Sequence, residues 1–205
     1  MAEVTALIDY GAGNLRSVAN ALRAAGGEGV VVTADPDVVR RADRIVLPGV
    51  GAFRACVEAL RAVPGLVAAM DERVHAGGVP FLGICVGMQL LATRGIEFGV
   101  TDGLDWIGGE VRRIEVTDPA IKVPHMGWND VVPRATSLVA PGEAYFLHSY
   151  HFVPDTGADI AAITDHGGGL VAAVARDTVL GVQFHPEKSQ DYGLALLAEF
   201  LKWKP

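Results

Sequence analysis

A repeated cycle in the first half of the chain constrains its fold more than any other feature of the sequence. A short apolar run rich in β-branched residues leads into a turn that contains glycine or proline, and a stretch with helical spacing follows. Parallel strands need a helical crossover between them, so this cycle is typical of an α/β protein with an open, mostly parallel sheet flanked by helices. The expected strands cover residues 4–9, 30–33, 44–47 and 80–84, and the expected helices cover residues 14–25, 52–62 and 66–76. We expect the strands at 30–33 and 44–47 to be neighbours in the sheet.

The second half of the chain has a different rhythm. Beyond about Gly99, short apolar runs alternate with Pro, Gly and Asp, which indicates antiparallel strands added to the sheet. These runs cover residues 110–116, 127–132, 145–147 and 170–175, and a further strand at 179–184 precedes an amphipathic helix at 192–203. Because the 205 residues contain no linker, repeat or low-complexity tract, we expect a single domain over residues 1–205.

Charge and cysteine content exclude several classes of function. The net charge is −7 and Lys and Arg do not cluster, whereas a nucleic-acid partner requires concentrated positive charge. The first apolar run is too short for a signal peptide or a membrane span, so we expect no membrane partner. Only two cysteines occur, which argues against a disulfide framework and fits a cytoplasmic location. GAGNLR lacks the third glycine of a dinucleotide fingerprint, at Arg16, and we expect neither a cofactor nor a metal site.

The segment PFLGICVGMQLL places a cysteine on a sharp strand-to-helix turn. Cys85 follows an apolar strand and is flanked by Gly83 and Gly87, as in the G-x-nucleophile-x-G elbow. The glycines are needed because side chains there would collide with the neighbouring strand or helix. The helix that follows directs its positive end at the sulfur and favours the thiolate. We therefore predict that Cys85 is a nucleophile, whereas Cys56, in an alanine-rich helix, is a small buried hydrophobe.

The segment LGVQFHPEKS supplies a base for that nucleophile. His185 follows the strand expected at 179–184, Pro186 ends that strand, and Glu187 can return its carboxylate to the imidazole. Cys85 and His185 both lie just past strands of a parallel sheet, at the edge that carries sites in such folds. None of the other histidines stands at an expected strand end with a carboxylate two residues later; they are His75, His125, His148, His151 and His166. We predict an acyl-transfer triad of Cys85, His185 and Glu187.

A tetrahedral oxyanion needs preorganised N–H donors as well. The N–H of Val86, directly after the nucleophile, is one candidate. The second is the N–H of Val50 or Gly51 in the PGVG turn, where glycine lets the peptide plane rotate. Alternatively, PGVG is only a strand-to-helix turn.

With these segments in place, the chain resembles a known family. PGVGAF, GICVGMQLL and GVQFHPEKS resemble the class I (triad-type) glutamine amidotransferases, and IDYGAGNLRSV, VPHMGWN and YFLHSYHF narrow the resemblance to the glutaminase subunits of imidazole glycerol phosphate synthase. The similarity spans residues 8–189. It implies hydrolysis of glutamine to glutamate and ammonia through a cysteinyl thioester. It also implies a heterodimer with a (β/α)₈-barrel cyclase, which receives the ammonia and makes imidazole glycerol phosphate and AICAR in histidine biosynthesis.

The resemblance also implies roles for residues around the triad. Gln89, one helical turn after the nucleophile, is expected to hold the amino-acid end of glutamine, helped by Gly51 and by the backbone of Ser149 and Tyr150. Glu97 is expected to contact the ammonium group of glutamine. Here the chain departs from the family pattern, because TRGIEFG has one acidic residue where relatives often have several.

Four residues fall in motifs that resemble the partner interface of the family: Asn14, Trp128, Tyr145 and Lys188. Each also has a structural interpretation. Asn14 is equally suited to cap a helix, Tyr145 and Trp128 to fill the core, and Lys188 to be solvated.

Two other functions stay open on the sequence. One is an amidotransferase for a different acceptor, or a stand-alone cysteine hydrolase on the same fold, which would turn over briskly without a partner. The other is a catalytically inactive module that only packs on a barrel protein. The intact set of Cys85, His185 and Glu187 argues against the inactive module.

Overall fold

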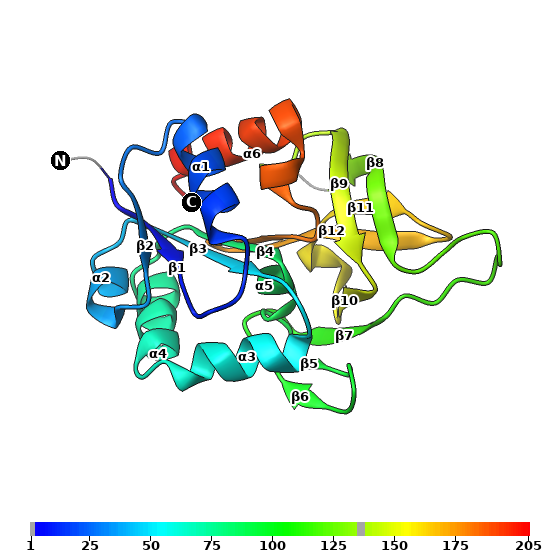
Figure 1. Cartoon of the computed structure of the whole chain (residues 1–205), viewed down its shortest axis with the longest axis horizontal. Coiled ribbons are helices and arrows are strands. Elements are labelled where there is room, and N and C mark those ends of the chain that lie inside the picture. The colour runs from blue at the N-terminus through cyan, green and yellow to red at the C-terminus, as the bar shows by residue number, and fades with distance from the viewer. Residues whose placement is uncertain (1–2, 135–137) are drawn as a thin grey trace.

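A computed structural model of the chain describes residues 3–134 and 138–205 (Figure 1). Its main feature is a sheet with the strand order β2-β1-β3-β4-β13-β12-β11-β8-β9. The first five strands in this order are parallel: β2 (Val30–Thr33), β1 (Thr5–Ile8), β3 (Arg44–Gly49), β4 (Phe81–Cys85) and β13 (Val179–Val182). The others are antiparallel: β12 (Gly169–Arg176), β11 (Ile160–Asp165), β8 (His125–Pro133) and β9 (Gly142–His148).

Helices cover both faces of the parallel half (Figure 1). On one face lie α1 (Leu15–Ala24) and α6 (Gln190–Lys202), which contact each other. On the other lie α2 (Pro36–Arg40), α3 (Phe53–Ala62), α4 (Leu66–Asp71), which continues as a π-helical turn at Glu72–Ala76, and α5 (Val86–Gln89). Strands β1, β3, β4 and β13 are buried along their whole length, which explains their continuous apolar runs.

A second, smaller sheet lies beside the antiparallel half. Its order is β10-β7-β5-β6, formed by β10 (Tyr150–Pro154), β7 (Gly109–Arg113), β5 (Arg94–Gly95) and β6 (Thr101–Asp102). β9 ends at His148 and β10 begins at Tyr150, so the chain leaves the large sheet and enters the small one within one residue, Ser149. Two 3₁₀ turns complete the elements, at Gly157–Asp159 and Pro186–Lys188.

The expected α/β architecture is confirmed, including the parallel sheet, the flanking helices and the antiparallel additions in the second half. The expectation that strands 30–33 and 44–47 are neighbours is wrong, because β1 pairs with both and lies between them. The chain runs outward from β1 to β2 and then crosses back over β1 to β3. Pairing order depends on these long-range crossovers and is not readable from strand patterns alone.

Other differences concern element ends and short elements. The strand expected at 179–184 stops at Val182, and α2, β10, β11 and the small sheet were not anticipated in full. Within the described residues, no helix combines the length and apolar character needed to cross a membrane.

Candidate active site

Cys85 occupies a strained turn at the end of β4. Its backbone has a φ of 55° and a ψ of −113°, which a residue with a side chain rarely adopts. A Cβ on Gly83 would lie 2.7 Å from the carbonyl oxygen of Gly87, and a Cβ on Gly87 would overlap the carbonyl oxygen of Leu47. Both flanking positions therefore admit only glycine, as the elbow motif predicts.

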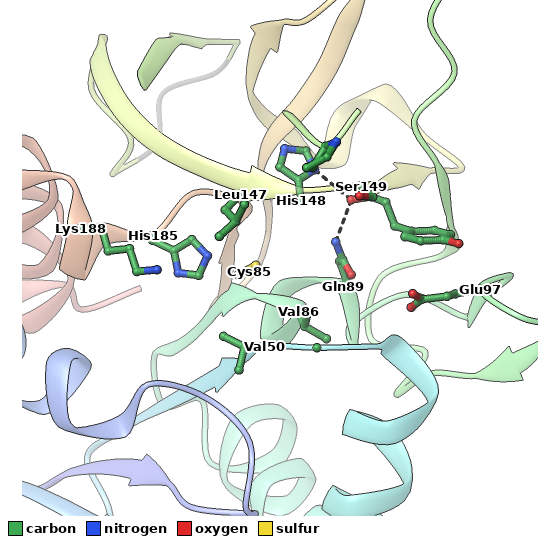
Figure 2. Close-up of a pocket in the computed structure, with 13 residues that line it drawn as sticks. Val50, Cys85, Val86, Gln89, Glu97, Leu147, His148, Ser149, His185 and Lys188 are labelled. Carbon is green, nitrogen blue, oxygen red and sulfur yellow. Dashed lines mark hydrogen bonds between the residues drawn. The ribbon is translucent and has the colours of Figure 1, made fainter. Parts of the chain in front are cut away.

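The helix that follows Cys85 is short. α5 spans only Val86–Gln89, a single turn, so its dipole has little charge to direct at the sulfur. His185 faces Cys85, and the side chains of the two residues interact (Figure 2).

His185 and Glu187 form a buried pair behind the sulfur. Nδ1 of His185 lies 2.8 Å from Oε1 of Glu187, and only 4% and 2% of the two side chains are exposed. The 3₁₀ turn that begins at Pro186 folds Glu187 back onto the ring. Burial lowers the pKa of His185, but hydrogen bonds and negative charge from Cys85 and Glu187 outweigh burial and raise this pKa to about 10. His185 is therefore an imidazolium at neutral pH, able to donate a proton.

Two further residues hold this arrangement and were missed by the sequence analysis. The Ser189 hydroxyl donates to the His185 carbonyl at 2.7 Å and accepts from the N–H of Tyr145 at 3.0 Å. The Gln183 amide donates to the Cys85 sulfur at 3.7 Å. The available sequence signal for Gln183 was a polar side chain in the apolar run LGVQF, and it is fully buried.

A cavity of about 370 Å³ opens beside Cys85 (Figure 2). It brings together all seven residues predicted for the oxyanion and substrate, which are Val50, Gly51, Val86, Gln89, Glu97, Ser149 and Tyr150. Cys85 and His185 also line it, together with Pro124, Leu147, His148 and Lys188. Residues far apart in the sequence thus converge on one pocket of a size suited to a small ligand.

Gln89 is fixed at the wall of this pocket. Its Nε2 donates to the Tyr150 carbonyl at 2.9 Å and to Oε1 of Gln183 at 2.9 Å. Because a carboxamide has two N–H donors, both are then in use and its oxygen is the atom left for a ligand.

Glu97 lies in the pocket but also has a structural contact. Its Oε2 accepts from the N–H of Phe53, the first residue of α3, at 2.8 Å. The N-cap residue of that helix, Ala52, makes no side-chain cap bond, so Glu97 supplies it from a distant segment.

The PGVG turn packs directly against the elbow. A Cβ on Gly49 would lie 2.6 Å from the backbone nitrogen of Gly87. The Val50 carbonyl accepts from the Cys56 thiol at 3.3 Å, so the planar peptide directs the Gly51 N–H away from Cys56. Gly51 has a φ of +100°, which glycine adopts readily.

Of the four residues predicted at a partner interface, three lie next to one another. Trp128 on β8 stands opposite Tyr145 on β9, with ring centroids 6.1 Å apart, and the Lys188 ammonium lies 5.9 Å from the Tyr145 ring centre. Trp128 is 47% exposed and therefore is not a core residue. Asn14 is exposed and caps α1 by accepting from the N–H of Ser17 at 3.4 Å.

The exposed face of the β8–β9 ladder is apolar around these side chains. Met126 is 65% exposed and stands opposite Leu147, which is 38% exposed. We call the set of Met126, Trp128, Tyr145, Leu147 and Lys188 the β8–β9 patch. It reaches the pocket, because Leu147 and Lys188 line both.

Comparison with known proteins identifies the class that this fold and site define. The sequence profile of the family described as glutamine amidotransferase class-I matches residues 6–203. A solved structure titled crystal structure of glutamine amidotransferase superposes with a TM-score of 0.77 at 18% identity, over 98% of this chain and 100% of that one, which supports the fold.

Curated relatives narrow the class. Imidazole glycerol phosphate synthase subunit HisH of Zymomonas mobilis is 60% identical over 204 residues, covering 98% of this chain and 96% of the relative. The HisH subunit of Caulobacter vibrioides is 54% identical over 218 residues, covering 99% and 100%. The chain belongs to the class-I glutamine amidotransferases and, within them, to the family of imidazole glycerol phosphate synthase HisH subunits.

Proposed function

We propose that the chain, acting as one domain, hydrolyses glutamine to glutamate and ammonia and delivers the ammonia to a cyclase subunit that makes imidazole glycerol phosphate. The observation that carries this proposal is the strained Cys85 facing the buried His185–Glu187 pair inside the pocket. Membership of the HisH family supports the pathway.

In the first half of the reaction the Cys85 thiolate attacks the side-chain carbonyl carbon of glutamine. A C–S bond forms and the carbonyl oxygen becomes an oxyanion. The imidazolium of His185 then gives its proton to the amide nitrogen, the C–N bond breaks, and ammonia leaves. The raised pKa of His185 suits this step, because the proton is already on the ring before substrate arrives.

In the second half neutral His185 removes a proton from water, which attacks the thioester. The C–S bond breaks, glutamate leaves, and the thiolate and imidazolium are restored together. Glu187 holds the ring so that its other nitrogen faces the sulfur and balances the imidazolium charge through the 2.8 Å contact.

The remaining pocket residues would bind and orient. We assign the oxyanion to the N–H of Val86 and to the PGVG turn, and the amino-acid end of glutamine to the Gln89 oxygen and the backbone of Ser149 and Tyr150. Glu97 keeps one carboxylate oxygen for the substrate ammonium while the other caps α3.

The partner would be a (β/α)₈-barrel cyclase seated on the β8–β9 patch. Exposed apolar side chains on one face of a ladder are typical of a protein–protein contact. Because the patch shares Leu147 and Lys188 with the pocket, ammonia released at Cys85 would leave directly beneath the partner. Asn14 would belong to the rim of the same interface, although it caps α1 in this structure.

The test is to mix the chain with the barrel cyclase and measure glutamate release with and without the cyclase's ribonucleotide substrate. We expect stimulation by that substrate, and loss of glutamate release in Cys85→Ala while ammonium-dependent synthesis by the complex persists. Glutamate release that persists in Cys85→Ala would remove Cys85 as the nucleophile. Brisk turnover without the cyclase would instead indicate a stand-alone hydrolase.

A further inference from the structure

Three histidines gather at one wall of the pocket: His148 lines the cavity, His125 contacts His148, and His166 stacks on His125. His125 and His148 are register partners in the β8–β9 ladder and are 3% and 7% exposed. The His125 ring is stacked between Phe146 and His166, at centroid distances of 4.6 and 4.2 Å. Within the part of the chain that the structure describes, no three His, Cys, Asp or Glu side chains are arranged to hold a metal ion.

Both buried rings are neutral at physiological pH. Burial, with the charge of His166, lowers the pKa of His125 to about 4. Burial lowers the pKa of His148 to about 3 in spite of its hydrogen bond with the Tyr150 carbonyl. Each ring thus carries one hydrogen, and the position of that hydrogen is set by its neighbours.

The hydrogen bonds determine which ring nitrogen of His148 and of His125 donates and which accepts. Nδ1 of His148 lies 2.9 Å from the Tyr150 carbonyl oxygen, which can only accept, so Nδ1 carries the hydrogen. Nε2 of His148 is then an acceptor, and it lies 3.0 Å from Nδ1 of His125. His125 therefore also carries its hydrogen on Nδ1 and leaves Nε2 bare.

Asn129 completes this chain of bonds at its far end. Its Nδ2 lies 3.0 Å from Nε2 of His125 and 2.7 Å from the carbonyl oxygen of Asp165. Its Oδ1 accepts from the N–H of Asp130 at 2.8 Å, which fixes which end of the amide is nitrogen. Two donors thus meet two acceptors, and every link is satisfied with neutral groups.

The near end of the chain reaches the glutamine site. The Tyr150 carbonyl that receives the His148 hydrogen also receives one from Gln89 (Figure 2). Its two hydrogen-bond donors hold this oxygen from two sides. Its position in turn orients the Gln89 carboxamide toward the pocket.

We propose that His148 is a positioning residue for glutamine: His125 and Asn129 hold it in one tautomer, and it fixes the Tyr150 carbonyl on which Gln89 is oriented. The inference rests on the proposed function, since it assigns a support to the same pocket. It adds that substrate affinity depends on His125 of β8, which does not line the pocket and acts through His148.

The tautomers can be observed directly. In the chain labelled with ¹⁵N-histidine, long-range ¹H–¹⁵N spectra at pH 7 should show His125 and His148 both protonated on Nδ1. A hydrogen on Nε2 of either ring, or a doubly protonated ring, would overturn the arrangement.

A matched pair of variants tests the positioning role in the complex with the cyclase. Asn presents an amide nitrogen where Nδ1 of histidine stands, whereas Gln presents it near Nε2. His148→Asn should keep the bond to the Tyr150 carbonyl and hold KM for glutamine within about threefold of wild type. His148→Gln should leave that carbonyl without its second donor and raise KM about tenfold, with kcat changed less than threefold.

A second readout separates glutamine recognition from thiol reactivity. The chloroketone analogue of glutamine, L-2-amino-4-oxo-5-chloropentanoic acid, should label Cys85 about tenfold more slowly in His148→Gln than in wild type, while iodoacetamide labels both alike. His166→Phe keeps the stacking on His125 but lies outside the chain of bonds, and it should label like wild type. If His148→Gln does not fold, His125→Phe takes its place, with an expected rise in KM of about sixfold.

The outcomes distinguish this inference from the proposed function. Equal KM values for wild type and His148→Gln, or an unchanged KM in His125→Phe, would overturn the positioning role and leave glutaminase activity standing. Absence of glutamine turnover and of chloroketone labelling in wild type would overturn the proposed function itself.

Discussion

The two halves of the large sheet differ in what covers them and in what they supply to the pocket. Strands β1, β3, β4 and β13 of the parallel half are buried on both faces. In the antiparallel half, β8 exposes Met126, Trp128 and Val132 along one side. The parallel half contributes Cys85 at a strand end and the turn that carries His185, and the antiparallel half contributes the wall around Tyr150 and the β8–β9 patch.

This difference separates Cys85 and His185 from the carbonyl of Tyr150, which orients Gln89. Cys85 ends the buried strand β4, so its position is set by backbone packed on both sides. The wall of the pocket at His148 belongs to the β8–β9 ladder, which is exposed on one face. Side-chain hydrogen bonds from this ladder hold the Tyr150 carbonyl. Substitutions in the parallel half should therefore lower kcat/KM and stability. Substitutions in the antiparallel half should change the affinity for substrate and the loss of stability at acid pH.

The largest effect expected in a test of this division comes from Glu187→Gln. Loss of the carboxylate charge lowers the pKa of His185, so the imidazolium loses its proton at a lower pH than in wild type. We expect kcat/KM for glutamine to fall at least about 100-fold and the alkaline limb of the pH–rate profile to move to lower pH. Glu143→Gln, an exposed carboxylate on β9, is the control. An alkaline limb that stays in place would contradict the assigned role of Glu187.

Gly87→Ala should mainly affect folding. The added methyl group would overlap the Leu47 carbonyl oxygen, which belongs to backbone and has no free space to move into. We expect a loss of about 3 kcal/mol in the free energy of unfolding, measured by urea denaturation. Gly157→Ala, whose methyl group would meet no atom within 4 Å, should stay within about 0.5 kcal/mol of wild type. Equal midpoints for the two variants would contradict the packing described for the elbow.

The last effect concerns acid and is confined to one half of the molecule. The pKa values of His125, His148 and His151 are lowered by burial to about 4, 3 and 4, so between pH 6.5 and these values the unfolded chain binds more protons than the folded one. The stability from these neutral rings is complete above pH 6.5 and is lost as the pH falls, by up to about 1.4 kcal/mol per pH unit for each ring. Between pH 7 and 5, protection factors from hydrogen exchange, which correct for the slower intrinsic exchange at lower pH, should fall first in β8, β9 and β10. An earlier loss of protection in β1 and β3 would place the acid response in the parallel half and contradict this prediction.

The sequence predicted the reacting groups because their geometry is local. Gly83, Cys85 and Gly87 lie within five residues, and His185 and Glu187 lie two apart, so each turn is written in one segment. The parallel strands were readable for the same reason, since burial on both faces leaves a continuous apolar run in each. The one-turn length of α5 was not readable, because no Gly or Pro stands between Gln89, where the helix ends, and Gly95.

The supporting residues depend on contacts across long stretches of chain. Gln183 reaches Cys85 over 98 residues and Gln89 over 94, and Ser189 reaches Tyr145 over 44. His125 meets His148 only because β8 and β9 pair in one particular register. A single segment carries no trace of such a partner, so histidines that the sequence analysis set aside became part of the wall of the pocket.

The backbone conformation that holds the Cys85 thiol in place also lowers the stability of the fold. A φ of 55° in a residue with a side chain costs of order 1–3 kcal/mol, an appreciable part of the 5–15 kcal/mol that typically separates a folded domain from its unfolded chain. Packing in the rest of the parallel half must offset this cost, even when no substrate is bound. Buried strands far from Cys85 thus matter for its position, because without the stability that they contribute the strained backbone could not hold the thiol where it is.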